Sequence, residues 1–223
     1  MCSSDLFAGV RHIIKNKLEG CLHPGKLCQA LHALVQSMGV TVLSGLEITH
    51  HERCSDGILL YTDKGIRLCG KQALVCTNGF AGQLFPELQV APARGQVLVT
   101  GPIPGLRIKG AFHFDEGYYY FRNLGNRVLL GGARNLAIAG ETTTEMELSA
   151  TVQNALESFL STCLLPGLKY EITDRWSGIM GFGPERMPVI KNIAPDIFCA
   201  AGLSGMGVAL APVLGEKIAG MMQ

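Results

Sequence analysis

The sequence lacks several features that would place it in a specialised class of protein. Charge of one sign is not in surplus: the 223 residues carry a formal net charge of +1, and only 17% of them are charged. Nucleic-acid and anionic-membrane partners are therefore not indicated. Residues 1–5 carry neither a basic stretch nor an apolar run, so no secretory signal is predicted. With 48% hydrophobic residues, the chain reads as a globular protein, and we expect it to be cytoplasmic.

Paired metal or disulfide ligands are also missing. The eight cysteines contain no C-x-x-C pair, and the six histidines are scattered. Metal sites need ligands at short, regular spacing, so no metal is predicted. Cys76 and Cys199 lie inside apolar runs, which favours buried free thiols in a reducing compartment.

One uncharged stretch, residues 197–215, is long enough to cross a bilayer. It contains Gly202, Gly205, Gly207 and Pro212, and this composition favours a strand, a tight turn and a helix. We therefore predict no membrane span. A protein anchored through 197–215 is the alternative reading.

The spacing of apolar residues and turn residues predicts a mixed α/β chain. Helices are expected at about 26–38, ended by Gly39, and at 144–160 and 206–221. The run at 73–77 is of the type found in sheets covered on both faces. Strands are expected at 9–22, 40–43, 46–49, 58–62, 66–68, 73–77, 94–100, 117–122, 127–131, 169–180, 188–190 and 197–201.

The most informative segment is 200–208, where an apolar strand runs into three glycines and then into a helix. Glycines permit a ligand to approach the backbone closely. The first turn of a helix has unpaired N–H groups and a partial positive charge, so it can bind an anionic or electron-rich atom. A strand–helix junction without a ligand is the alternative.

The pattern G-x-x-G-x-G-V-x-L-A-P-x-x-G at 202–215 resembles the C-terminal signature of the D-amino-acid oxidase, glycine oxidase and sarcosine oxidase family of flavoproteins. Further segments resemble other motifs of that family in the same order. These segments are LHPGKL at 22–27, LEI at 46–48, VCTNG at 75–79, PARGQV at 92–97, GYYYFR at 117–122, LGGAR at 130–134, WSGI at 176–179 and PERMPVI at 184–190.

The resemblance implies a truncated Rossmann-like FAD-binding domain joined to an antiparallel β-sheet substrate domain. Sarcosine oxidases of this family attach the flavin through a cysteine near the W-x-G block. No cysteine lies between Cys163 and Cys199 here, so the resemblance implies a non-covalent flavin. The implied divisions are 1–22 as a strand remnant of the substrate domain, 23–90 as part of the FAD domain, 91–180 as the substrate domain, and 181–223 as the last strand and helix of the FAD domain.

The resemblance also implies a reaction, in which a hydride from a small amine or amino acid passes to flavin N5 and leaves an imine. The helix beginning near Met206 would direct its N–H groups at the N1–C2=O edge of the flavin, where negative charge builds on reduction. The expected cofactor contacts are Ile48, Thr77, Gly178, Gly202, Leu203, Ser204, Gly205, Met206, Gly207 and Val208.

Four residues are candidates for the catalytic site. Tyr118, Tyr120 and Arg122 share one face of a strand, and a phenol there could hydrogen-bond a substrate carboxylate. Arg134 could pair with that carboxylate in a bidentate manner. Aromatic packing of the sheet and a solvated surface arginine are the alternatives.

Two departures bear on the substrate. Glycine oxidases have arginines where this chain has Met180 and Gly205, so a simple glycine-type substrate is not supported. The amine, the electron acceptor and the oligomeric state are not given by the sequence.

The family's opening strand–GxGxxG–helix unit, which cradles the pyrophosphate, has no counterpart in residues 1–20. We expect the chain to be a fragment that binds FAD weakly or not at all alone. A non-catalytic remnant or binding module of the same fold is the alternative.

Overall fold

The computed structural model describes residues 6–223, so the first five residues of the expected strand remnant lie outside it. The chain divides into two compact units. Unit 1 comprises the residues up to Cys21 and Ala93–Ile179, and unit 2 comprises Leu22–Pro92 and Met180–Gln223.

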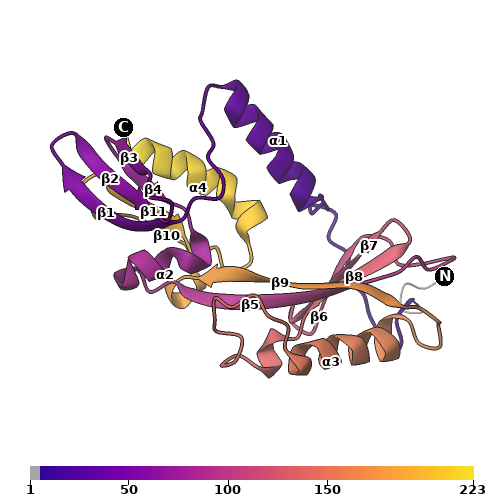
Figure 1. Ribbon diagram of the computed structural model, residues 1–223. Coiled ribbons are helices and arrows are strands. Elements are labelled where there is room, and N and C mark those ends of the chain that lie inside the picture. The colour runs from indigo at the N-terminus through magenta and orange to yellow at the C-terminus, as the bar shows by residue number, and fades with distance from the viewer. Residues whose placement is uncertain (1–5) are drawn as a thin grey trace. The chain divides into compact units, whose positions relative to one another are not determined.

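Groups of three or four strands lie between successive α-helices in residues 6–223 (Figure 1). The helices are α1 (Pro24–Ser37), α2 (Ala81–Leu84), α3 (Ala150–Phe159) and α4 (Gly207–Met221). The strands are β1 (Ile48–Cys54), β2 (Gly57–Thr62), β3 (Arg67–Gly70), β4 (Ala73–Val75), β5 (Ala91–Thr100), β6 (Ala111–Phe114), β7 (Tyr119–Leu124), β8 (Arg127–Gly132), β9 (Ile172–Phe182), β10 (Val189–Ala194) and β11 (Ile197–Ala201).

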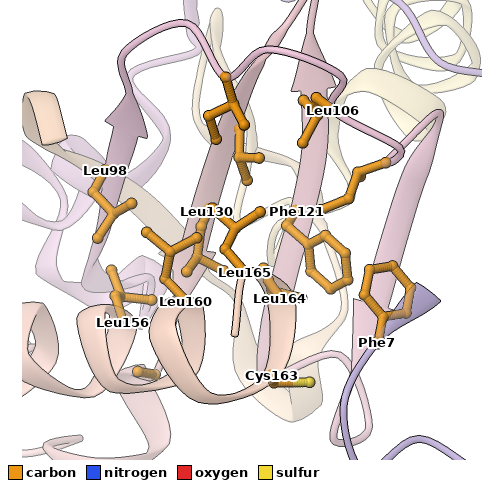
Figure 2. Packing of buried hydrophobic residues seen from close by; sticks show 14 of the residues in the cluster. Phe7, Leu98, Leu106, Phe121, Leu130, Leu156, Leu160, Cys163, Leu164 and Leu165 are labelled. Atoms are coloured by element: carbon orange, nitrogen blue, oxygen red, sulfur yellow. The ribbon is translucent and has the colours of Figure 1, made fainter. Parts of the chain in front are cut away.

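Unit 1 is built on a five-stranded sheet with the strand order β6-β7-β8-β5-β9. Its core lies where α3 packs against the sheet, and Figure 2 shows Leu156 of α3 and Leu160 just after it facing the strands. Residues of β7 alternate in this contact: Phe121 is 4% exposed within the core, whereas Tyr120 lies on the opposite face over Gly131. The antiparallel pairing of β7 with β8 fixes this alternation.

A buried polar network joins β5 to the loop before α3. The guanidinium of Arg94 donates to both carboxylate oxygens of Glu141, at 2.8 and 2.9 Å. The Gln96 side-chain amide donates to Glu141 at 2.8 Å and to the Ser149 hydroxyl at 2.9 Å. Since Glu141 is 1% exposed, these bonds replace the water that its charge loses on folding.

Unit 2 contains two three-stranded sheets, ordered β1-β2-β3 and β10-β11-β4. In the second sheet β4 runs parallel to β11, while β10 is antiparallel to it. A second core of buried residues forms in this unit: Ile58, Ala81, Phe85, Leu88, Val90, Ile197, Cys199 and Ala201.

The two long helices of unit 2 bury little of their apolar surface. α4 has only two charged residues, Glu216 and Lys217, yet Ile218 is its one buried residue. α1 has no buried residue. Helices that are apolar on every side are normally enclosed by other structure. Much of the apolar surface of α4 is not covered by the described residues.

The mixed α/β fold class, the helix after Pro24 and the hairpin around 63–65 are confirmed. The strands expected at 9–22 and 40–43 are absent from the described residues. Val10 and Ile13 pack against the core of unit 1, but Ile14 is 97% exposed and Leu18 is 96% exposed, so the segment lies against the core without a strand partner.

Three further expectations are corrected. The helix expected at 144–160 begins at Ala150, because the Ser149 hydroxyl accepts from the Val152 amide and caps it. Cys76 is exposed, whereas Cys199 is fully buried as predicted. The strand expected at 73–77 is shorter and half-exposed. Within residues 6–223, no helix has the length and apolar character needed to cross a bilayer.

The Arg94–Glu141 network predicts a pH dependence of stability. Burial alone would raise the pKa of the Glu141 carboxyl, but hydrogen bonds from Arg94, Gln96 and Ser149 and the charge of Arg94 lower it to about 2. A lowered pKa adds stability above the ordinary value of 4.5, and that stability is lost as the pH falls from 4.5 towards 2. Glu141→Gln should reduce the free energy of unfolding at neutral pH by about 3 kcal/mol.

Denaturation monitored by Trp176, the one tryptophan of the chain and a residue of unit 1, measures this effect. Glu116→Gln, at an exposed position in unit 1, is the matched control. The network account is wrong if wild type and Glu141→Gln lose stability in parallel between pH 4.5 and 2.

Candidate functional site

The turn between β11 and α4 is the centre of the candidate site. Gly202, Ser204 and Gly205 all have positive φ, at 75°, 50° and 84°. Such angles suit glycine and are uncommon for serine. The Met206 amide donates to the Leu203 carbonyl at 2.8 Å and closes the turn. The chain therefore reverses within five residues and enters α4.

The end of β9 holds one side of this turn. The Ser204 amide donates to the Gly181 carbonyl at 2.8 Å, and Phe182 forms an antiparallel bridge with Leu203. Residues 78–79 pack directly against the backbone of Gly181. A side chain at this position would collide with them, since a Cβ would lie 2.6 Å from the Asn78 side-chain oxygen and 2.7 Å from the Gly79 nitrogen. Three segments distant in sequence thus meet at the turn.

The N-terminus of α4 has no side-chain cap, and its first turn has no acidic residue. Within residues 6–223, neither the Gly207 nor the Val208 amide donates to an acceptor. These N–H groups and the helix dipole place a partial positive charge at this end. Met206 and Val208 are more than half exposed, so the end of the helix is accessible. It can bind an electron-rich group without displacing a side-chain cap.

The other expected cofactor contacts are distributed over three sheets and both units. Thr77 follows β4, is exposed, and its carbonyl accepts from the Phe80 amide at 3.0 Å. Because β4 and β11 are parallel, Thr77 lies at the same sheet edge as the 202–206 turn. Ile48 is half-buried in the separate β1-β2-β3 sheet of unit 2.

Gly178 in β9, assigned to unit 1, differs from Gly181 in the same strand. A Cβ added at Gly178 would meet no atom within 4 Å. Packing inside the described chain therefore gives no reason for a glycine at this position.

All four expected catalytic residues lie in unit 1. The Tyr118 carbonyl accepts from the Ala133 amide at 2.8 Å, which places Tyr118 beside the chain segment of Arg134. Tyr120 pairs with Gly131, and its ring lies against that glycine. Burial raises the pKa of the Tyr120 phenol, so it remains protonated at neutral pH. It can then act as a hydrogen-bond donor.

The two arginines have different surroundings. Arg122 pairs with Leu129, two positions along the ladder from Tyr120, on the same face. Arg134 begins a single 3-10 turn, Arg134–Leu136, and donates to the Thr142 hydroxyl at 3.4 Å. Among the described residues, no group of three or more His, Cys, Asp or Glu side chains is arranged to hold a metal.

Asn78 is the residue of this site that the sequence reasoning missed. It stands at positive φ directly after Thr77, and its Oδ1 atom accepts from the Gly202 amide at 3.0 Å and the Leu203 amide at 3.4 Å. An asparagine at the end of a strand was a visible signal, although its partners lie 124 and 125 residues away.

A family model described as FAD dependent oxidoreductase matches residues 4–221. The chain belongs to this family. The FAD dependent oxidoreductase fold also recurs in solved structures. L-proline dehydrogenase from P. horikoshii superposes with a TM-score of 0.74 at 22% identity, over 90% of this chain and 55% of that one. Glycine oxidase from Geobacillus kaustophilus gives 0.73 at 21% identity, over 86% and 52%.

A curated relative from Maricaulis maris (strain MCS10) is 28% identical over 173 residues, which is 75% of this chain and 26% of that protein. It is named tRNA 5-methylaminomethyl-2-thiouridine biosynthesis bifunctional protein MnmC. The chain therefore spans about a quarter of that relative and about half of each solved structure.

The contrast between two glycines of β9 gives a testable prediction. Gly181→Ala should lower the free energy of unfolding by about 1–3 kcal/mol, because its Cβ would collide with Asn78 and Gly79. Gly178→Ala should change it by less than about 0.5 kcal/mol, since the space there is open. Urea denaturation followed by circular dichroism measures both variants. Equal destabilisation of the two would contradict the packing described for this strand.

Proposed function

We propose that this chain supplies the flavin-edge and substrate-binding parts of an FAD-dependent oxidoreductase that acts on an amine or amino acid. The observation that carries the proposal is the uncapped N-terminus of α4 after the left-handed turn at 202–206, in a chain whose family is FAD dependent. Bound flavin would supply the redox chemistry by accepting a hydride from the carbon beside the substrate amine.

The residues present fit such a cofactor. The Gly207 and Val208 amides are free to donate to an electron-rich ring edge, and the dipole of α4 would stabilise negative charge there. Gly178 and Gly205 leave room for close approach, because a Cβ at either position would meet nothing nearer than 4.0 Å. We propose that the flavin is held without a covalent bond, since no cysteine lies between Cys163 and Cys199.

We propose that FAD binding needs structure beyond the residues described. The poorly buried α4 and α1 and the half-length match to the solved structures support this view. The 223-residue chain alone should then bind FAD at least about 100-fold more weakly than a polypeptide that also contains a strand–GxGxxG–helix unit.

Titration of FAD fluorescence with each polypeptide measures this difference. Release of unmodified FAD on acid precipitation of the longer polypeptide would support the non-covalent assignment. A tightly flavinated 223-residue chain would overturn the proposed dependence on further structure.

We propose that Tyr118 and Arg134 bind the substrate through its carboxylate. A bidentate arginine contact selects carboxylates by geometry and charge. Tyr118 is 39% exposed, so its phenol is accessible to a ligand. The protonated Tyr120 phenol on the same β7–β8 pair would add a hydrogen bond but no charge.

Arg134→Ala in the flavin-loaded protein should lower kcat/KM for amino acids by roughly 10- to 100-fold, the contribution of charge-assisted hydrogen bonds. It should leave amines without a carboxylate unaffected. Anaerobic bleaching of flavin absorbance with each substrate measures the effect, and Lys109→Ala, at an exposed position of unit 1, is the control. An equal loss for both substrate classes would show that Arg134 does not recognise the carboxylate.

A second candidate substrate is an amine carried on a modified tRNA base. The name of the Maricaulis maris relative favours it, whereas the net charge of +1 does not. The same bleaching assay with a modified tRNA and with free amino acids distinguishes the two substrates.

A further inference from the structure

We propose that Asn78 is a positioning residue that sets the direction of the α4 N-terminus by tying the end of β4 to the turn before the helix. The inference deepens the proposed function, and it rests on that function where it concerns the flavin. The tie itself is a property of unit 2 and can be measured without any cofactor.

The contact is specific to one side-chain atom. Oδ1 of Asn78 accepts from two successive amides, those of Gly202 at 3.0 Å and Leu203 at 3.4 Å. Both donors lie at the start of the turn, and Gly202 is buried. An unpaired amide in that position would carry a desolvation cost of about 1–3 kcal/mol. The Asn78 side chain therefore accepts from the two amides that follow the last residue of β11.

The backbone of Asn78 is adapted to this role. Its φ of 47° lies in the left-handed region, where asparagine is one of the few residues found routinely apart from glycine. Asn78 is the first residue of a single 3-10 turn, Asn78–Phe80, and Gly79 within it is buried. The chain after β4 thus turns at Asn78, and the side-chain amide of Asn78 lies against the 202–206 turn.

The end of β9 also holds the 202–206 turn. A Cβ at Gly181 would lie 2.6 Å from Asn78 Oδ1, and the Gly181 carbonyl accepts from the Ser204 amide at 2.8 Å. The turn is therefore held by Asn78 at its first two residues and by Gly181 at its third. A Cβ added at Gly205 would meet only the Met180 sulfur, at 4.0 Å.

These anchors matter because the turn contains two glycines with positive φ, Gly202 and Gly205. Glycines of this kind have wide conformational freedom, so the turn would act as a hinge without its anchors. A change of direction at the hinge would move the unpaired amides of Gly207 and Val208. Electrostatic stabilisation depends on donors that are held in place before charge develops.

Two substitutions separate the side chain of Asn78 from its backbone. Asn78→Gly retains the left-handed conformation but removes Oδ1. Asn78→Asp retains an acceptor at the same position. Gln89→Gly is the matched control, since Gln89 is an exposed residue of unit 2 that also has positive φ, at 53°.

Amide hydrogen exchange of the 223-residue chain, read by mass spectrometry, tests the tie directly. Peptides covering 202–206 should exchange about tenfold faster in Asn78→Gly, equivalent to about 1.4 kcal/mol of lost protection. Asn78→Asp and Gln89→Gly should remain within about threefold of wild type. The proposal is overturned if Asn78→Gly exchanges like wild type, or if Asn78→Asp exchanges as fast as Asn78→Gly.

The reduction potential of bound FAD, measured in the longer polypeptide that contains a strand–GxGxxG–helix unit, tests the link to the cofactor. Asn78→Gly should lower this potential, because misdirected amides stabilise the reduced flavin less, while Gln89→Gly should not change it. If Asn78→Gly exchanges faster but leaves the potential unchanged, the hydrogen-bond tie stands and the flavin does not lie at α4. That result would overturn the proposed function and the flavin part of the inference. Unchanged exchange would refute the tie alone.

Discussion

The candidate site depends on one backbone constraint, the reversal of the chain at 202–206 through three residues with positive φ. The reversal is costly for Ser204, and Gly202 and Gly205 provide little stiffness. It is held because amides of the turn donate to two acceptors outside the segment, the Gly181 carbonyl and Asn78 Oδ1. The accessible and uncapped end of α4 follows from this arrangement, since the anchors satisfy the turn and leave the first helical amides free.

The two units use different means to hold their parts. Unit 1 has a leucine-rich core between α3 and a five-stranded sheet (Figure 2), together with the buried Arg94–Glu141 pair. Unit 2 has small sheets, a smaller core and helices with exposed apolar surface. In unit 2, α1 has no buried residue and α4 has one, and the chain spans about half of each solved structure.

Sequence patterns predicted elements where local signals and tertiary surroundings agree. The strand–glycine–helix unit at 197–221 was predicted because apolar residues, glycines and a helical run occur in succession. The predicted start of α3 was wrong, because the acids Glu145 and Glu147 resemble the first turn of a helix. In the structure Ser149 caps the helix and also hydrogen-bonds Gln96. Asn78 was missed because its partners are more than 120 residues away, and no local pattern carries that information.

We propose that the N-terminus of α4 faces the flavin ring. A crystal structure of the longest natural polypeptide that contains this chain, with FAD bound, measures it most directly. The account predicts the Gly207 or Val208 nitrogen at about 2.7–3.2 Å from an electron-rich atom of the ring. A ring held elsewhere, with these amides bonded to solvent or to a side chain, would contradict the account.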